Sequence, residues 1–403
     1  MELTRRQQVR LSAAVIAVTT VAVLSAATLP ARAAPSEGRI VGAGSPGAIS
    51  SSYIVTLKSG SGGMAAGSDA GKDLARKYGA SIRHTYGAAL NGYAVRLPAA
   101  QARRLAADPG VASVVQDTEV SLAGTQENPP SWGLDRIDQA NLPLDASYTW
   151  PGGGGSGVTA YVIDTGIRTA HQDFGGRASS GWDFVDDDAV ANDGNGHGTH
   201  VAGTIAGGSY GVAKKARVVG VRVLDSDGSG STAQVIAGID WVASHARKPA
   251  VANMSLGGLF NSQLDAAVRN AIAAGVTFTV AAGNDNLPAD LFSPARVSEA
   301  ITVGATDRTD RKASFSNWGG TVDLFAPGVD ITSAWNTSNS GSEKISGTSM
   351  AAPHAAGAAA VYLGDHPSAS PAGVAKALVD RAAPGKVGGA GLGSPNRLLQ
   401  VKN

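Results

Sequence analysis

Short apolar runs recur along the chain from about residue 130 onward, and they show little alternation with polar positions. They cover residues 158–163, 218–223, 251–254 and 276–280. Such runs are typical of parallel strands buried on both faces of a sheet. Alanine-rich stretches with helical character alternate with them, at residues 200–206, 232–245, 264–274 and 350–363. This alternation predicts a doubly wound, mostly parallel α/β sheet, in which a functional site lies beyond the carboxyl ends of the strands.

The segment from residue 51 to residue 122 has a different pattern. Its first strand is expected at residues 53–57, which alternate and are rich in aromatic and β-branched side chains. Further strands are expected at residues 82–86, 93–97 and 111–120, and helices at residues 69–77 and 99–107. The order βαββαβ predicts a small α+β, ferredoxin-like domain. A polar joint with a proline pair follows at residues 125–130, so we expect a small domain at 51–122 and a larger one at 125–403.

The N-terminus has the features of a secretory signal. Arg5, Arg6 and Arg10 precede an apolar run at residues 11–29, and the triplet Ala31-Arg32-Ala33 supplies a cleavage site. We therefore expect a signal peptide at residues 1–33, an extracellular product and no membrane attachment after cleavage. The alternative is an uncleaved membrane anchor. The arginine pair also resembles a twin-arginine signal, although the general secretory route is favoured.

Composition narrows the function further. The 403 residues carry a formal net charge of +1, with 16% charged residues and no long basic or acidic block. Nothing therefore indicates a nucleic-acid partner. Cysteine is absent, which excludes disulfides, thiolate catalysis and cysteine-ligated metals. We expect a monomer whose stability depends on packing and on oxygen-ligated cations.

Three motifs carry the chemistry. Asp164 ends an apolar run in Val-Ile-Asp-Thr-Gly, His197 lies in Gly-His-Gly-Thr-His-Val-Ala-Gly, and Ser349 lies in Gly-Thr-Ser-Met-Ala-Ala-Pro-His. A serine hydroxyl needs a base to remove its proton, and imidazole has a suitable pKa of about 6.5. A carboxylate behind the imidazole fixes its tautomer. His200 competes with His197 for the role of base, but it lies within the expected helix, so it is interpreted as structural, as is His354.

These motifs resemble those of the subtilisin-like serine proteases, in the order Asp, His, Ser. The local sequences are most similar to the proteinase K and aqualysin branch, through Trp132–Gln139, Gly220–Asp225 and Ser314–Asn317. The resemblance covers nearly all of the chain after the signal, and the segment 51–122 resembles the I9-type inhibitory prodomain of this family. It implies a secreted endopeptidase that cleaves protein and peptide substrates, with its own prodomain as an intramolecular inhibitor.

The resemblance also assigns the oxyanion hole and the substrate cleft. Asn284 matches the residue that donates to the oxyanion together with the backbone N–H of Ser349. Two glycine-rich edge segments would clamp an extended peptide. The cleft residues are Gly228, Ser229, Gly230, Ser255, Leu256, Gly257, Gly258, Ala282 and Gly283. The expected wall of the P1 pocket, Leu256–Gly258 and Ala281–Gly283, carries no charge, which predicts an apolar or aromatic P1 residue and broad specificity.

Structural calcium is the cofactor that the resemblance implies. Asp323 matches a family ligand that works with the carbonyls of Ser298 and Ala300. A further site would use Asp135, Asp138, Gln139 and Asp145, although an asparagine usual there is replaced by Ser147. Oxygen ligands suit Ca²⁺ rather than zinc. A third acidic cluster, Asp186, Asp187, Asp188 and Asp193, is interpreted either as a weak site or as a solvated loop.

Self-processing and two rival functions complete the predictions. The end of the prodomain would lie in the cleft and be cut between Leu122 and Thr125. An esterase or lipase would require a G-x-S-x-G elbow, which the sequence around Ser349 lacks. An inactive binding scaffold should have lost a triad or oxyanion residue, and none is missing.

Overall fold

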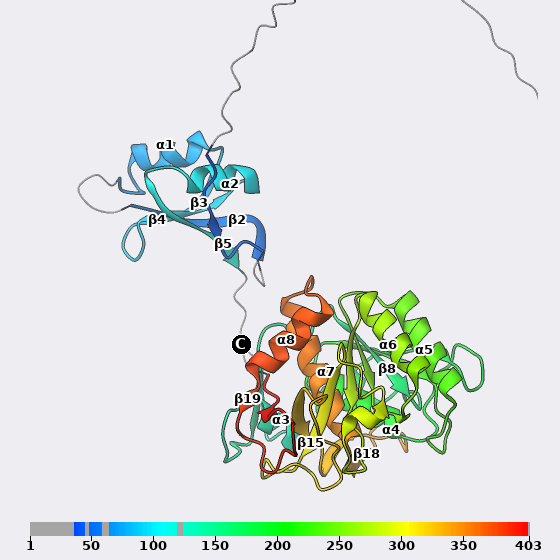
Figure 1. The fold of residues 1–403 in the computed structure, drawn as a ribbon. Helices are drawn as coiled ribbons and strands as arrows, with labels where there is room; N and C mark the ends of the chain where they lie inside the picture. The colour runs from blue at the N-terminus through cyan, green and yellow to red at the C-terminus, as the bar shows by residue number, and fades with distance from the viewer. Residues whose placement is uncertain (1–35, 45–47, 59–63, 119–123, 402–403) are drawn as a thin grey trace, which may run out of the picture.

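The structure of the protein is a computed structural model that describes residues 36–44, 48–58, 64–118 and 124–401 (Figure 1). Three sequence predictions lie wholly or partly outside the described residues. They are the signal peptide at 1–33, the end of the last predicted prodomain strand at 119–120, and the expected cleavage region between Leu122 and Thr125.

The N-terminal part of the described chain forms a five-stranded sheet in the order β1-β5-β2-β4-β3. Its elements are β1 (Ile40–Val41), β2 (Ala48–Leu57), α1 (Asp69–Lys77), β3 (Ser81–Tyr86), β4 (Gly92–Arg96), α2 (Ala99–Ala106) and β5 (Val111–Thr118). From β2 onward the order βαββαβ and the antiparallel pairing confirm the expected ferredoxin-like unit. Ser68 caps α1 by accepting a hydrogen bond from the N–H of Gly71 at 3.1 Å, and basic residues occupy the last turn of the helix.

The larger sheet has nine strands in the order β19-β20-β16-β15-β13-β11-β8-β10-β9. Its central strands are β8 (Thr159–Asp164), β10 (Arg217–Arg222), β11 (Ala250–Met254), β13 (Thr277–Ala281), β15 (Ile301–Thr306) and β16 (Leu324–Pro327). These strands pair in parallel, and most of their residues are buried. The doubly wound α/β prediction is therefore confirmed, and the four predicted strands are present within one residue at each end.

The edge strands were not predicted from the sequence. They are β9 (Ala178–Asp183), β19 (Ala383–Pro384) and β20 (Arg397–Leu398), with β19 antiparallel to β20. Three two-stranded ribbons lie outside the large sheet, formed by β6 (Gly124–Glu127) with β7 (Ser147–Trp150), β12 (Gly258–Leu259) with β14 (Phe292–Ser293), and β17 (Ile331–Ala334) with β18 (Ser342–Ile345). Two-residue strands and strands such as β9, in which Ser and Gly replace apolar residues, leave no clear hydrophobic pattern.

Helices cover both faces of the large sheet. On one face α4 (His197–Ala206) packs with α7 (Thr348–Asp365), and on the other α5 (Thr232–His245) packs beside α6 (Ser262–Ala273), as Figure 1 shows. Two further helices, α3 (Trp132–Ile137) and α8 (Pro371–Arg381), were not predicted. Most of α7 is buried on all sides, and its many alanines allow strands and helices to approach it closely.

Candidate active site

Three segment ends bring the predicted triad residues to the carboxyl edge of the sheet. Asp164 is the last residue of β8, His197 is the first residue of α4, and Ser349 is the second residue of α7. The carboxyl ends of parallel strands meet at one edge of a sheet, where the connecting loops build the site. The location that the sequence predicted is therefore the one that the fold provides.

Asp164 and His197 form a hydrogen-bonded pair in which the carboxylate is buried and the imidazole is partly exposed. The distance between His197 Nδ1 and Asp164 Oδ1 is 2.7 Å, and the same carboxylate oxygen accepts the N–H of Thr165 at 2.8 Å. Asp164 is fully buried. With Nδ1–H directed at the carboxylate, the imidazole has Nε2 free as an acceptor, which is the tautomer that a general base requires.

The electrostatic surroundings favour a protonated His197. Burial of the imidazole lowers its pKa, but the charge and hydrogen bond of Asp164 and the charge of Asp193 outweigh this effect, so the pKa of His197 is raised above 6.5. The imidazolium formed when the base takes a proton is therefore stabilised by the protein.

Asp193 fixes the loop that carries the base. Its Oδ1 accepts from the N–H groups of Asn195 and Gly196 and from the Thr165 hydroxyl, at 3.0, 2.8 and 2.9 Å. Its Oδ2 accepts the N–H of Thr199 at 2.8 Å and also its hydroxyl. This buried carboxylate thus ties the start of α4 to the end of β8. For Asp193, neither a weak metal site nor a solvated loop describes what the structure shows.

The rest of that acidic cluster belongs to loop structure. Asp186 pairs with Arg222 at 2.6 Å, and Asp183, which the sequence analysis did not single out, pairs with the same guanidinium at 2.7 Å. Asp188 accepts the N–H of Val190 at 2.7 Å within the turn. Asp187 is exposed, with its backbone at φ 58°.

Ser349 is linked to Ser255 by two reciprocal hydrogen bonds. Ser349 Oγ donates to the carbonyl of Ser255 at 2.9 Å, and Ser255 Oγ donates to the carbonyl of Ser349 at 2.7 Å. The second bond is available because Pro353, four residues after Ser349, has no N–H to give to that carbonyl. The expected bond from Ser349 to His197 is not formed in this structure, so attack requires the hydroxyl to rotate from Ser255 to Nε2.

Asn284 is oriented by Thr348, the residue before the nucleophile. Its Oδ1 accepts the N–H and the hydroxyl of Thr348, both at 2.9 Å. With the carbonyl oxygen engaged, the Nδ2 donors of Asn284 have no hydrogen-bond acceptor among the described residues. The Thr348 hydroxyl in turn accepts the N–H of Gly283 at 3.1 Å. A free amide donor therefore lies beside the start of α7, where the N–H of Ser349, the second residue of the helix, has no intrahelical acceptor.

A second asparagine supports the same segment, although the sequence analysis assigned it no role. Asn317 Nδ2 donates to the carbonyl of Ala282 at 2.9 Å, and its Oδ1 accepts the N–H groups of Asp285 and Leu287, each at 3.0 Å. Gly283 is required here, because its φ is 103° and a Cβ would lie 2.3 Å from Asn317 Nδ2. Asn317 and Thr348 both lie in sequence stretches that carry the family resemblance, Ser314–Asn317 and the motif around Ser349. Their contacts, however, become visible only in the folded structure.

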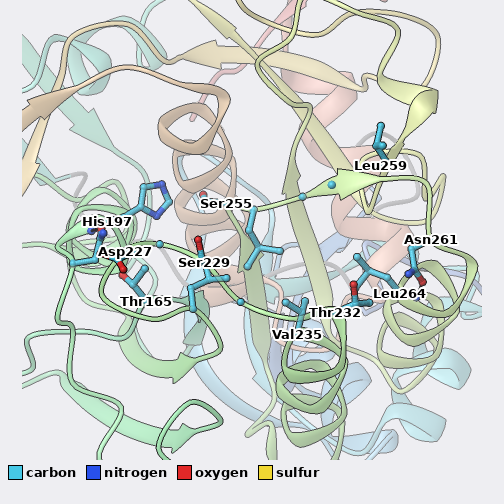
Figure 2. Close-up of a pocket in the computed structure, with 17 residues that line it drawn as sticks. Thr165, His197, Asp227, Ser229, Thr232, Val235, Ser255, Leu259, Asn261 and Leu264 are labelled. Carbon is cyan, nitrogen blue, oxygen red and sulfur yellow. Dashed lines mark hydrogen bonds between the residues drawn. The ribbon is translucent and has the colours of Figure 1, made fainter.

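Two adjoining cavities lie beside these groups. The first, of about 660 Å³, is lined by His197, by the segment 228–230, by residues 255–259 and by the side chains of Leu224, Val235 and Leu264 (Figure 2). The second, of about 530 Å³, is lined by Ser349, Asn284, residues 256–259 and residues 281–283. All nine residues predicted for the cleft therefore line one or both cavities.

The prediction that the wall of the P1 pocket carries no charge needs a correction. The wall segments that the sequence analysis named are uncharged, as expected, but Asp285 also lines the second cavity and Asp227 lines the first. Both carboxylates are exposed at the surface. Asp285 was missed because it follows the matched wall segment by two positions, and whether its side chain faces the cavity depends on the turn held by Asn317.

Asp323 has the surroundings of a cation ligand. Burial raises the pKa of this carboxyl to about 6, against the opposing effects of the Thr302 N–H and of Arg397. Asp323 Oδ2 accepts that N–H at 2.8 Å. Residues 298–300 lead directly into β15, which runs beside Asp323. A poorly solvated carboxylate is one of the oxygen ligands that Ca²⁺ prefers.

The residues of the second predicted metal cluster lie on α3 and in the loop that follows it. Asp135 accepts the N–H groups of Asp145 and Ala146 at 3.2 and 2.9 Å, and Asp138 accepts the N–H of Thr149 at 2.6 Å. The side chain of Gln139 donates to the carbonyl of Pro143 at 2.7 Å. Burial raises the pKa of Asp135, backbone N–H groups lower it and the charge of Asp145 raises it further. Across the described ranges, no group of three or more His, Cys, Asp or Glu side chains is arranged to hold a metal ion.

The fold and this site define a serine peptidase, and comparison with known proteins identifies its family: the chain belongs to the subtilase family. The model of the Subtilase family matches residues 155–397, and that of the Peptidase inhibitor I9 family matches residues 52–123. The chain is therefore a serine-type endopeptidase with an N-terminal inhibitor-type prodomain.

Particular relatives agree with this assignment. An "Extracellular serine proteinase" of a Thermus species is 56% identical over 321 residues, which cover 80% of this chain and 78% of that protein. A "Cuticle-degrading serine protease" of Arthrobotrys oligospora is 43% identical over 379 residues, covering 89% and 92%. The crystal structure of a cold-adapted subtilisin-like serine proteinase is similar with a TM-score of 0.66 at 56% identity, covering 68% of this chain and 98% of that chain. In the part of the chain that the structure describes, no helix is long and apolar enough to cross a membrane.

Proposed function

We propose that the chain is a secreted zymogen whose mature form hydrolyses internal peptide bonds with Asp164, His197 and Ser349 as its catalytic triad. The observation that carries this proposal is the 2.7 Å hydrogen bond from His197 Nδ1 to Asp164 Oδ1, made beside two adjoining cavities, one of which is lined by Ser349. The relatives whose names include "extracellular" and "exoprotease" support secretion.

The proposed reaction proceeds by acyl transfer. The Ser349 hydroxyl turns from the carbonyl of Ser255 to Nε2 of His197, gives up its proton and forms a bond to the scissile carbonyl carbon. The imidazolium, held by Asp164, then protonates the leaving amine as the C–N bond breaks. Water repeats the sequence on the acyl-enzyme, with His197 again as base, and releases the acid and the free serine.

The oxyanion of each tetrahedral intermediate is proposed to lie between two donors. One is Asn284 Nδ2, which has no other acceptor among the described residues because its amide is oriented by Thr348. The other is the backbone N–H of Ser349 at the positive end of α7. Both donors are fixed before substrate arrives, so they require little reorganisation when charge develops.

The P1 side chain of the substrate is proposed to occupy the second cavity. Leu256, Ala281 and Ala282 supply apolar walls, and Gly257 and Gly258 leave room for a large side chain and close backbone contact. This favours apolar and aromatic residues with broad tolerance. The exposed carboxylate of Asp285 extends that tolerance to basic P1 residues.

Structural calcium is proposed at Asp323 with the carbonyls of Ser298 and Ala300, and at the loop of Asp135, Asp138, Gln139 and Asp145. At Asp323 the support is a partly buried carboxylate whose pKa is raised to about 6 by desolvation, because a bound cation would compensate that desolvation. Around Asp135 the support is the raised pKa of this carboxyl, which burial raises first and the charge of Asp145 raises further. Because the chain has no cysteine, such ions would supply the cross-links that disulfides give other secreted proteins.

Maturation is proposed to remove residues 1–33 as a signal peptide and then the prodomain at 51–122, by self-cleavage between Leu122 and Thr125. The match of residues 52–123 to the Peptidase inhibitor I9 family supports an intramolecular inhibitor. The peptidase domain, 125–403, would then act as a monomer on extracellular protein and peptide substrates, with no nucleic-acid or membrane partner.

The experiment is casein hydrolysis by purified wild type and Ser349→Ala, each with calcium and with excess EDTA. Wild type with calcium should cut casein and lose its prodomain, whereas Ser349→Ala should do neither, with a fall in kcat of about 10⁶. Retained activity in Ser349→Ala would contradict the nucleophile, and an inert wild type would favour the inactive scaffold.

A further inference from the structure

A half-buried lysine is bonded to the turn that follows Asn284. The ammonium of Lys312 donates a hydrogen bond to Asn286 Oδ1 at 3.0 Å. It also donates to the carbonyl oxygens of Ala313 and Ser316, at 3.1 and 2.9 Å, so all three N–H groups of the ammonium are engaged. Burial lowers the pKa of Lys312, and no carboxylate among the described residues opposes this shift. A lysine that served only solubility would extend its charge into water, so the arrangement requires another explanation.

The turn bonded to Lys312 has an uncommon backbone conformation. Asn286 has a φ of 53°, in the left-handed region, which non-glycine residues adopt mainly where surrounding contacts hold them. Its N–H donates to the carbonyl of Phe315 at 2.8 Å, and its carbonyl accepts from Trp318 Nε1 at 3.0 Å. Together with the bond from Lys312, these contacts attach Asn286 to the segment 312–318 at three points.

The backbone of Lys312 is itself fixed to the large sheet. Lys312 forms an antiparallel bridge with Thr306, the last residue of β15. The N–H of the next residue, Ala313, donates to the carbonyl of Ala305 at 2.9 Å. The side chain of Lys312 therefore connects β15 to the turn at Asn286.

The same turn determines where the side chain of Asn284 lies. On one side, Thr348 donates to Asn284 Oδ1. On the other, Asn317 accepts the N–H groups of the residues before and after Asn286, while Lys312 holds the side chain of Asn286 itself. A donor of an oxyanion hole must be held within about 0.5 Å of its productive position, so a small shift of this turn should matter for catalysis.

We infer that Lys312 is a positioning residue for the oxyanion hole: its ammonium fixes the turn at Asn286 so that the amide of Asn284 meets the developing oxyanion. The inference rests on the proposed function, because it assumes that Asn284 donates to that oxygen. Lys312 lines neither of the two cavities. Its effect should therefore appear in kcat, through Asn284, and not in the binding of substrate.

The test is a double-mutant cycle with Lys312→Met and Asn284→Ala, measured on Ala-Ala-Pro-Phe p-nitroanilide per mole of matured protein. Lys312→Met keeps the apolar stem and removes the ammonium. It should lower kcat about 10-fold and leave KM within about 2-fold of wild type, because a displaced donor weakens only the stabilisation of the transition state. In the Asn284→Ala background, where the donor is already lost, the same substitution should leave kcat unchanged.

Two further variants complete the design. Asn286→Gly removes the side-chain acceptor and accommodates the left-handed conformation, so it should lower kcat by the same factor as Lys312→Met, with no further loss when the two are combined. It also tests the link if Lys312→Met fails to fold. The control is Lys248→Met, which removes a bond from a lysine to the carbonyl of Ala274 near the start of β11, at the amino ends of the strands. This control should keep the wild-type kcat.

The outcomes separate the role of Lys312 from the proposed function. If Lys312→Met and Asn286→Gly keep the wild-type kcat, the inference is wrong. It is also wrong if Lys312→Met lowers kcat by the same factor with and without Asn284, because a purely structural lysine would reduce the fraction of folded enzyme in both backgrounds. If wild type does not cut the tetrapeptide substrate, the proposed peptidase function is wrong and the inference falls with it.

Discussion

Two buried histidines should make the enzyme sensitive to acid. His200 lies on the helix of the base and His354 on the helix of the nucleophile, and both are fully buried. Burial lowers the pKa of His200 to about 3 and that of His354 to about 4, against an unfolded value of 6.5. Both stay neutral at the pH where the unfolded chain begins to take up protons.

The sign and size of the effect follow from linkage. Above pH 6.5 both histidines are neutral in the folded and in the unfolded state, so they do not change the free energy of unfolding. As pH falls below 6.5, the unfolded state binds the extra protons, so the folded state loses about 1.4 kcal/mol per pH unit for each histidine until its own pKa is reached. At pH 5 the loss is about 2 kcal/mol for each histidine, or about 4 kcal/mol together. His197 acts in the opposite direction, since its pKa is raised.

A variant isolates one histidine from these opposing effects. In a Ser349→Ala background, which prevents self-digestion, the unfolding free energy should be measured by urea titration at pH 8 and pH 5 with saturating calcium. Adding His354→Gln should reduce the loss between the two pH values by about 2 kcal/mol, whatever its effect at pH 8. His245→Gln, at an exposed site on α5, is the control and should leave the loss unchanged. An unchanged pH dependence in His354→Gln would refute the reasoning.

Three further predictions concern carboxylates. Asp193→Asn should shift the acid limb of the pH profile of kcat/KM to lower pH, because the charge of Asp193 raises the pKa of His197. Its lost hydrogen bonds should also lower the free energy of unfolding by about 2–4 kcal/mol. An unshifted acid limb would show that Asp193 does not influence the pKa of His197. Asp285→Asn should lower kcat/KM for a substrate with Lys at P1 about 2- to 10-fold and leave one with Phe at P1 unchanged; equal effects on both would contradict its place at the cavity. Asp323→Asn should abolish the stabilisation by calcium at that site, so Tm should rise less than in wild type when EDTA is replaced by 10 mM calcium. Each kcal/mol of lost stabilisation should reduce that rise by about 2–4 °C for a domain of this size. An unaltered rise would exclude Asp323 as a calcium ligand.

The sequence predicted the parts of the fold that repeat a simple pattern. Strands such as β13 (Thr277–Ala281) are largely apolar and fully buried because both faces of the sheet are covered, and helices such as Thr232–His245 carry a clear cap at Ser231. By contrast, β9 pairs in the large sheet although Ser179, Ser180 and Gly181 interrupt its pattern, since its place at the edge depends on β10. Edge strands receive much of their stability from the neighbour and little from their own residues.

The candidate site shows the same division between local and distant information. Asp164, His197 and Ser349 could be chosen because each motif combines a reactive side chain with the end of an element. The exchange of hydrogen bonds between Ser349 and Ser255 could not be predicted, because the two residues are 94 positions apart. The role of Asp193 was missed for a related reason: an acid in an aspartate-rich loop does not reveal which backbone N–H groups will surround it.

The most direct test of the account is the site at which a serine-directed reagent forms its adduct. Mature wild type should be incubated with diisopropyl fluorophosphate and mapped by peptide mass spectrometry, with residual casein hydrolysis measured in the same samples. The account predicts one adduct, on Ser349, formed in proportion to the lost activity, and much slower labelling in His197→Ala, which lacks the base. An adduct on another residue, or complete loss of activity with Ser349 unmodified, would contradict it.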